Sequence, residues 1–217
     1  MLLSIIFLLP PGLQGQQLQE RPKVGLVLSG GAAKGMAHVG VLKVLEEVGI
    51  EPDIITSTSM GSVIGGLYAI GYRADSMETL LLQQDWEQVL SDRMELENVI
   101  LEEKDYFENQ LFEIGYKNGQ FIPPSGLIYG QQVDNLLSRL AIPAYRTEDF
   151  RDFPIPFRCV AADIVEGQPV VLDSGDLAGA MRASMAIPTA FTPVEREGQI
   201  MIDGGLIRNF PVEEAKA

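Results

Sequence analysis

SGGAAKG, residues Ser29 to Gly35, follows the apolar run Val24–Leu28 and precedes the helical pattern Met36–Val48. The apolar run predicts a short buried strand, and apolar residues at helical spacing predict the helix. A strand, a glycine-rich turn and a helix together bring backbone N–H groups close to negative charge. That charge is either a bound phosphate or an anion that exists only during a reaction, and the rest of the sequence has to distinguish the two.

The elements that follow predict an α/β fold with a mainly parallel central sheet flanked by helices. A second strand, Asp53–Thr56, and a second helix, Met60–Ile70, continue the pattern. Two strands joined through a helix of this length form a parallel unit with a right-handed crossover. Gly49 and Gly71 are expected to end the two helices. A mostly helical insertion is expected around 75–150, with a looser segment at Gly115–Gly126. After it, the sequence predicts a hairpin of Pro156–Ala162 with Pro169–Leu172, a helix at Asp176–Met185 and a strand at Gln199–Ile202.

The composition of the chain argues against several classes of ligand. The 217 residues are 46% hydrophobic and carry a formal net charge of −14. That charge argues against nucleic acid, whose phosphates it would repel, and leaves apolar contact as the route to any lipid. One cysteine, Cys159, allows no internal disulfide, and we expect a buried, inert thiol. One histidine and no carboxylate cluster at ligand spacing predict no metal site and no cofactor.

Residues 1–20 are expected to lie outside the folded domain, which we place at 21–217. Leu2–Leu9 is an apolar run too short to span a bilayer, and Pro10-Pro-Gly and a polar segment follow it. This pattern is typical of a secretory signal peptide, although it lacks the basic residues that usually begin one. The alternative is an apolar leader with no export role. We expect export, to the periplasm or the outer membrane.

Ser59 is the candidate nucleophile. It lies in Thr56-Ser-Thr-Ser-Met-Gly-Ser62, between the second strand and the second helix, at the serine of a G-x-S-x-G pattern whose first glycine is Ser57. A serine on such a turn projects its Oγ from the sheet, and the helix N-terminus favours negative charge there. The alternative is that these serines only cap the helix. Gly61 is expected to let the helix lie close to the sheet.

The general base is either His38 or a carboxylate. A Ser-His-Asp triad needs a histidine, and His38 is the only one in the chain. Its position inside the first helix favours a packing role. Asp203 is the candidate carboxylate, because it ends the strand Gln199–Ile202 and precedes Gly204 and Gly205, which allow a tight loop. We expect the ends of parallel strands to bring Asp203 to the sheet edge that also carries Ser59.

The glycine-rich stretch does not fit nucleotide binding. A P-loop needs lysine directly after the last glycine, where this chain has Met36, and a dinucleotide loop needs glycine where Ala32 stands. An oxyanion hole needs only exposed N–H groups close to the nucleophile. Gly30, Gly31 and Ala32 are the expected donors, with Gly35 as a supporting position.

Four ordered blocks of this sequence resemble the patatin-like phospholipases. They are Leu28-Ser-Gly-Gly-Ala-Ala-Lys-Gly35, Ser57-Thr-Ser-Met-Gly61, Arg182-Ala-Ser-Met-Ala-Ile-Pro188 and Asp203-Gly-Gly-Leu-Ile-Arg-Asn-Phe-Pro211. The resemblance implies a three-layer patatin-like fold and metal-free hydrolysis of acyl esters in phospholipids or lysophospholipids. It implies a Ser-Asp dyad of Ser59 and Asp203, with the oxyanion loop at Gly30, Gly31 and Ala32. Ser57 and Ala32 stand where the family usually has glycine.

The resemblance also implies partners. It implies a membrane lipid or lysolipid substrate, and neither nucleic acid nor nucleotide. Exported bacterial members often carry a C-terminal outer-membrane barrel. Since Val212–Ala217 is typical of the start of a helix, we expect this chain to be a fragment of a longer protein, without any such barrel. Two other functions stay open: a lipid-binding or scaffold domain without turnover, and a nucleotide-binding domain.

Overall fold

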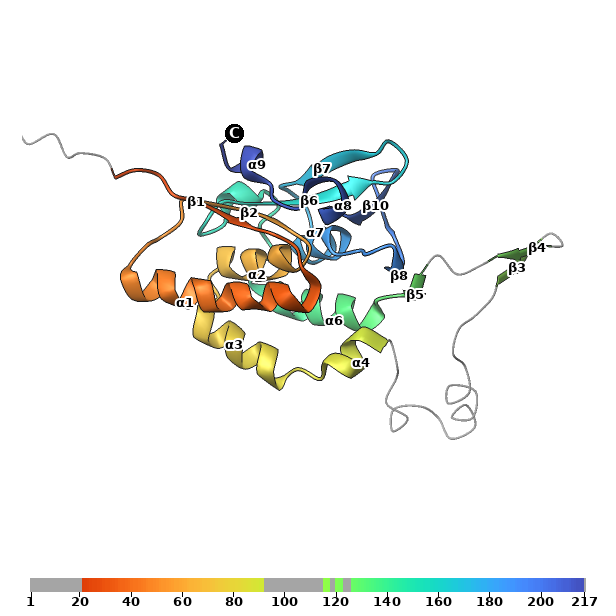
Figure 1. Ribbon diagram of the computed structural model, residues 1–217, viewed down its shortest axis with the longest axis horizontal. Helices are drawn as coiled ribbons and strands as arrows, with labels where there is room; N and C mark the ends of the chain where they lie inside the picture. Colours follow the sequence, from red (N-terminus) through yellow and green to blue (C-terminus); the bar gives the residue numbers. More distant parts are fainter. Residues whose placement is uncertain (1–20, 92–114, 118–119, 123–125, 217) are drawn as a thin grey trace, which may run out of the picture.

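The computed structural model describes residues 21–91, 115–117, 120–122 and 126–216. A central sheet lies between helices, with α1 and α2 on one side of it and α9 on the other (Figure 1). The strand order is β1-β2-β6-β10-β9, and β7 also pairs with β6. The strands of this sheet are β1 Gly25–Leu28, β2 Ile54–Thr58, β6 Phe157–Asp163, β7 Gln168–Leu172, β9 Val194–Arg196 and β10 Gln199–Asp203. The predicted α/β fold, with helices on both sides of a central sheet, is confirmed.

The sheet has a parallel half and an antiparallel half. β1, β2 and β6 run parallel, as the predicted crossover unit requires. β7 and β10 pair with β6 in the antiparallel direction, and β9 pairs antiparallel with β10. The hairpin of β6 and β7 confirms the predicted turn, with Gly167 in the left-handed region at φ 66°. The expectation that Asp203 ends a parallel strand was wrong, since β10 runs opposite to β6.

The helices follow the apolar periodicity of the sequence. They are α1 His38–Val48, α2 Met60–Ala69, α3 Ala74–Gln83, α4 Trp86–Ser91, α6 Gln131–Leu140, α7 Leu177–Ser184, α8 Gly205–Arg208 and α9 Val212–Lys216, with short 3₁₀ helices η1 Ala32–Ala37, η4 Ile142–Ala144 and η5 Phe150–Asp152. The first helix begins later than expected, because η1 takes up most of the glycine-rich stretch. Gly49 ends α1 in the left-handed conformation, as predicted.

Side chains of β2 alternate between the two layers that cover the sheet. Ile55 faces α2, since its Cγ2 lies 3.0 Å from where a Cβ on Gly65 would sit. Thr56 faces the opposite layer, where its hydroxyl donates to the Pro211 carbonyl at 2.8 Å. This period of two is normal for a strand buried on both faces. The three-layer arrangement therefore places the end of β2 between α2 and the segment that carries α8 and α9.

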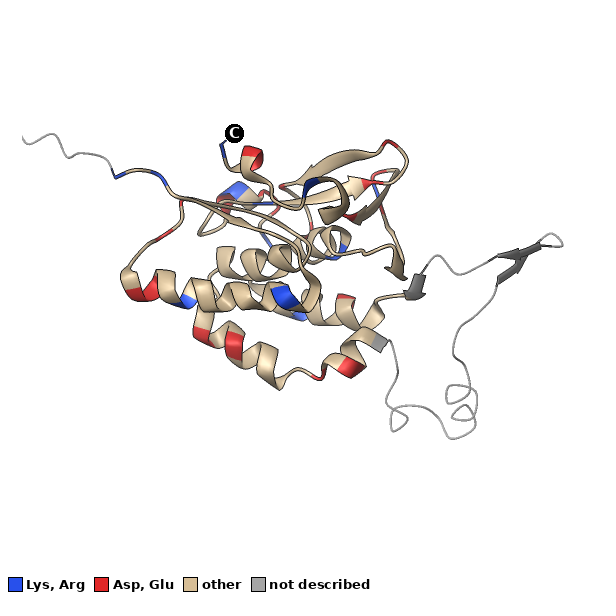
Figure 2. Ribbon diagram, viewed as in Figure 1, with Lys and Arg blue, Asp and Glu red and all other residues tan. Residues whose placement is uncertain are grey.

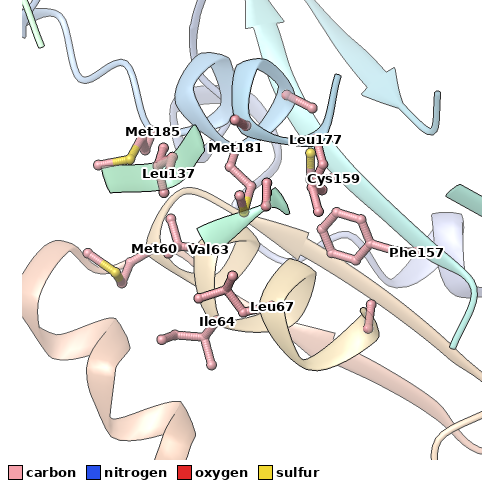
Figure 3. Packing of buried hydrophobic residues seen from close by; sticks show 14 of the residues in the cluster. Met60, Val63, Ile64, Leu67, Leu137, Phe157, Cys159, Leu177, Met181 and Met185 are labelled. Atoms are coloured by element: carbon pink, nitrogen blue, oxygen red, sulfur yellow. The ribbon is translucent and has the colours of Figure 1, made fainter. Parts of the chain in front are cut away.

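The hydrophobic core lies between α2, α6, α7 and the sheet. Figure 3 shows Met60, Val63, Leu67, Leu137 and Met181 meeting there. α2 supplies much of it, since nearly all residues of this helix are buried. A helix that is apolar on all sides is typical of the interior of a domain. Cys159 belongs to the same core, and burial raises the pKa of its thiol to about 12. It is therefore buried and protonated at neutral pH, as expected.

Acidic residues gather on several outer elements. Figure 2 shows them on α1, α3 and α4, and others on α9 and at the turn of the β6–β7 hairpin. Lys43 of α1 pairs with Asp75 and Glu78 of α3 at 3.0 Å and 2.8 Å, which ties these two helices together. Within the described ranges, no helix is both long enough and apolar enough to span a bilayer.

Two expectations fall partly or wholly outside the described residues. The apolar leader at 1–20 lies outside them, so export stays a prediction. Of the insertion around 75–150, α3, α4, α6 and two short strands, β3 Gly115–Lys117 and β4 Gln120–Ile122, are described, and 92–114 are not. A third short strand, β5 Gly126–Ile128, pairs parallel with β8 Thr189–Phe191. The domain limits stay a prediction as well.

Candidate active site

Ser59 occupies the single residue between β2 and α2. Its backbone has φ 53° and ψ −128°, a conformation that L-residues rarely adopt and that costs on the order of 1–3 kcal/mol. It is the N-cap of α2 by position, but its side chain makes no capping hydrogen bond. The helix-capping alternative is therefore wrong for Ser59. The sharp turn instead directs Oγ away from the helix and towards the end of another strand.

That strand is β10, and its last residue is Asp203. The Ser59 hydroxyl donates to Asp203 Oδ2 at 2.6 Å, a short bond typical of a hydroxyl and a carboxylate. Ser59 is 4% exposed and Asp203 is 6% exposed. The two residues are 144 positions apart in the chain and form a buried serine–carboxylate pair.

The pairing of β6 explains why these two residues meet. β2 runs along one flank of β6 until Thr58 reaches Val160. On the same flank, β10 begins its pairing at Asp163 and ends where Asp203 reaches Ala161, while β7 occupies the other flank. The C-terminal ends of β2 and β10 therefore point at each other across adjacent positions of β6. An antiparallel strand, not the expected parallel one, brings the carboxylate to the serine.

The two carboxylate oxygens of Asp203 have different partners. Oδ1 accepts the Gly205 N–H at 2.7 Å, which leaves Oδ2 for Ser59. Burial raises the pKa of the Asp203 carboxyl above its ordinary value, and the hydrogen bonds from Ser59 and Gly205 oppose that rise. Desolvation makes a carboxylate a better proton acceptor. The environment of Asp203 therefore suits a general base.

His38 has a different partner. Its Nε2 lies 2.9 Å from the Ser29 carbonyl oxygen, and because a carbonyl can only accept, Nε2 carries the proton of this bond. The ring thus ties the start of α1 to the end of β1. In the described part of the chain, no three His, Cys, Asp or Glu side chains are grouped so as to hold a metal ion.

The glycine-rich stretch lies directly over the serine. A Cβ on Gly30 would sit 2.7 Å from Ser59 Cβ, so only glycine fits this approach. The Gly30 N–H donates to Asn209 Oδ1 at 2.9 Å and is therefore engaged. Among the described residues, no acceptor meets the N–H of Gly31 or of Ala32. Ala32 has φ 47°, a left-handed conformation that is costly for alanine.

The other four glycines that the sequence singled out also lie at close contacts. A Cβ on Gly35 would be 2.7 Å from Met60 Cβ, and one on Gly61 would be 2.5 Å from the Leu28 carbonyl oxygen. A Cβ on Gly204 would clash with the Val160 carbonyl oxygen, and a Cβ on Gly205 would lie 2.9 Å from Asp203 Oδ1. Glycine at these positions lets the loop around the pair and the start of α2 pack against β1 and β6.

A cavity of about 400 Å³ opens beside the pair. Ser59, Ala32 and Ala33 line it, together with side chains of α2, α3, α4 and α6 and with Met36, Met185, Ile187 and Phe191. Nearly all of these side chains are apolar, including Val63, Leu67, Trp86 and Leu140. The cavity therefore joins the serine and the glycine-rich loop to an apolar chamber.

Two residues of the site were missed by sequence reasoning. The Ser184 hydroxyl accepts the Ser59 N–H at 2.9 Å, and Asn209 accepts the Gly30 N–H. Both lie inside the blocks that carried the family resemblance, which was the only signal for them. The positions of Ser184 and Asn209 along the sequence, relative to Ser59 and Asp203, do not suggest a contact.

Comparisons with known proteins place the chain in a family. The patatin-like phospholipase family model matches residues 26–216. An uncharacterized NTE family protein of Mycobacterium tuberculosis is 30% identical over 88% of this chain and 45% of its own length. Lysophospholipase NTE1 of Candida albicans is 31% identical over 89% of this chain and 12% of its own length. The chain thus spans less than half of these relatives. The crystal structure of VipD from Legionella pneumophila superposes with a TM-score of 0.55 and 17% identity, over 87% of this chain and 47% of VipD, which supports the fold. The chain belongs to the patatin-like phospholipase family.

Proposed function

We propose that this domain is a serine acyl hydrolase that cleaves carboxylic esters of phospholipids or lysophospholipids, with Ser59 as nucleophile and Asp203 as general base. The observation that carries the proposal is the 2.6 Å hydrogen bond from the Ser59 hydroxyl to Asp203, together with the apolar cavity that Ser59 lines. Family membership supports lipid acyl hydrolysis in general, and the roles of the two residues come from this geometry.

The first half of the reaction transfers the acyl group to the enzyme. Ser59 Oγ attacks the ester carbonyl carbon while its proton passes to Asp203 Oδ2, which already accepts that hydrogen bond. The carbonyl oxygen becomes an oxyanion, and the N–H groups of Gly31 and Ala32 are the proposed donors to it. Collapse of the intermediate breaks the bond to the alcohol, which leaves with the proton from Asp203.

The second half of the reaction releases the fatty acid. A water molecule gives its proton to Asp203 and attacks the acyl-enzyme, and the same N–H groups stabilise the second oxyanion. Collapse of this intermediate frees the acid and returns the proton to Ser59 Oγ. The cycle is balanced in protons and needs no further group, because one carboxylate alternately accepts and donates.

The cavity indicates the substrate class. Its volume of about 400 Å³ is in the range of small-molecule pockets, and its apolar lining suits an acyl chain. A bound chain buries apolar surface, which contributes about 25 cal/mol per Å². A formal net charge of −14 disfavours electrostatic attraction to anionic lipid, so apolar contact is the proposed source of affinity.

Kinetics with three proteins test the proposal. Wild type is expected to hydrolyse p-nitrophenyl butyrate and lysophosphatidylcholine, and Ser59→Ala is expected to have no turnover. Asp203→Asn keeps the shape of the side chain but loses its basic oxygen, so kcat is expected to fall by about 10²–10⁴. Circular dichroism and thermal unfolding confirm that the variants are folded. Lipid binding by a wild-type protein without turnover would instead support the non-catalytic lipid-binding domain.

A further inference from the structure

Ser184 is a buried polar residue that the proposed reaction does not use. It is the last residue of α7, and it is 0% exposed. Its hydroxyl accepts the Ser59 N–H at 2.9 Å and donates to the Val160 carbonyl oxygen at 2.6 Å. One hydroxyl therefore links the nucleophile's own backbone to β6, the strand that both Ser59 and Asp203 border.

The backbone of Ser59 needs such a link. A non-glycine residue at φ 53° persists only where its surroundings hold it in place. Two serines do so here, one on each side of the residue. Ser184 holds the N–H of Ser59, and the Ser62 hydroxyl donates to the Ser59 carbonyl oxygen at 2.6 Å. Without Ser184, the buried N–H of Ser59 would have no acceptor, which favours relaxation of the turn.

The segment from Ser184 to Ala186 also holds the other member of the pair. The Asp203 N–H donates to the Ala186 carbonyl oxygen at 2.9 Å, and the Gly204 N–H donates to the Ser184 carbonyl oxygen at 3.3 Å. Thus two residues of this segment, Ser184 and Ala186, bind the backbone of Ser59 and the backbone of Asp203–Gly204. These hydrogen bonds add to the pairing of β2 and β10 with β6 in fixing the distance between the two functional groups.

We propose that Ser184 is a positioning residue: its hydroxyl holds Ser59 in the strained turn and thereby keeps Ser59 Oγ within hydrogen-bond distance of Asp203 Oδ2. The inference rests on the proposed function, since it assigns a role in the same reaction. Ser184 is not among the described residues that line the cavity, so it acts through Ser59 and not through the substrate.

Ser184→Ala is expected to lower kcat on p-nitrophenyl butyrate by roughly 10²-fold, the size of effect that a displacement of about 1 Å has on a reacting group. KM is expected to stay at the wild-type value, because the cavity is unchanged. A second readout is the acid limb of the pH–rate profile. The Ser59 hydrogen bond lowers the pKa of Asp203, so losing it is expected to move that limb to higher pH.

Two further variants separate positioning from stability. Ser57→Ala removes another fully buried serine hydroxyl, whose hydrogen bond to the Arg158 carbonyl oxygen is long at 3.4 Å. It is expected to keep wild-type kcat and an unshifted acid limb. Ser184→Cys keeps the unbranched shape of the side chain, with a somewhat larger sulfur atom, but replaces a strong donor and acceptor with a weak one, so it is expected to lose activity as Ser184→Ala does. If the alanine variant does not fold, the cysteine variant decides.

The result that overturns the inference is wild-type kcat, with an unmoved acid limb, in a folded Ser184→Ala or Ser184→Cys protein. A loss of kcat that Ser57→Ala shares equally also overturns it, since that would be a general effect of removing a buried hydroxyl. Failure of the proposed function looks different. In that case wild type itself would not turn over substrate, whatever stands at position 184.

Discussion

Gly30→Ala places a methyl group where the glycine-rich loop meets the serine. The new Cβ would lie 2.7 Å from Ser59 Cβ and 2.8 Å from Asn209 Oδ1. Relief requires a movement of about 1 Å, because apolar atoms pack best at about 3.5–4.0 Å. Ser59 is held from both sides by Ser184 and Ser62, so the loop is the part that moves.

The size of the effect depends on the displaced N–H groups. Loss of one oxyanion donor costs about 10²–10³ in kcat, and moving the loop displaces the proposed donors Gly31 and Ala32 together. We therefore expect kcat on p-nitrophenyl butyrate to fall by at least about 10². The assay is steady-state hydrolysis with purified protein, with thermal unfolding measured alongside.

Gly40→Ala is the matched control. Gly40 lies within α1, and a Cβ there would meet none of the described atoms within 4 Å. Alanine in an open helix position is expected to leave kcat unchanged and to raise the free energy of unfolding by about 0.5–1 kcal/mol. Wild-type kcat in a folded Gly30→Ala protein would refute the assignment of this loop to the site.

The remaining predictions concern His38, the pH profile and Ala32. His38→Gln is expected to keep kcat within an order of magnitude of wild type, because His38 binds the Ser29 carbonyl; a folded but inactive variant would make histidine the base. The acid limb of kcat/KM is expected above pH 3.8, the ordinary carboxyl pKa. Burial raises the pKa of Asp203, and activity is lost as the pH falls through that pKa. An acid limb that disappears in His38→Gln would contradict this prediction. Ala32→Gly is expected to raise the free energy of unfolding by about 1 kcal/mol, because alanine is strained at φ 47°. Chemical denaturation measures this free energy, and an unchanged midpoint would contradict the prediction.

The sequence predicted the first half of the fold well, because its elements have strong local signals. β1, α1, β2 and α2 carry apolar periodicity, and Gly49 marks a helix end. The direction of β10 had no such signal. A strand of five residues has the same pattern in either direction, and only its pairing with β6 shows that it runs antiparallel.

The candidate site was partly predictable for a similar reason. Ser59 comes directly after a strand and two residues before Gly61, and Asp203 ends a strand directly before Gly204, so their turns could be recognised locally. Ser184 and Asn209 act through single hydrogen bonds to residues 125 and 179 positions away. Such contacts depend on the packing of α7 and α8 against the sheet, which no local pattern records.

Mapping the residue that a fluorophosphonate probe modifies identifies the nucleophile. Such probes phosphonylate an activated serine, and peptide mass spectrometry shows which one. We predict a single modification at Ser59, with a labelling rate that falls by about 10² or more in Asp203→Asn, since the carboxylate activates the hydroxyl. Modification of Ser57 or Ser62 instead, or labelling of Ser59 at an unchanged rate in Asp203→Asn, would contradict the roles proposed for the pair.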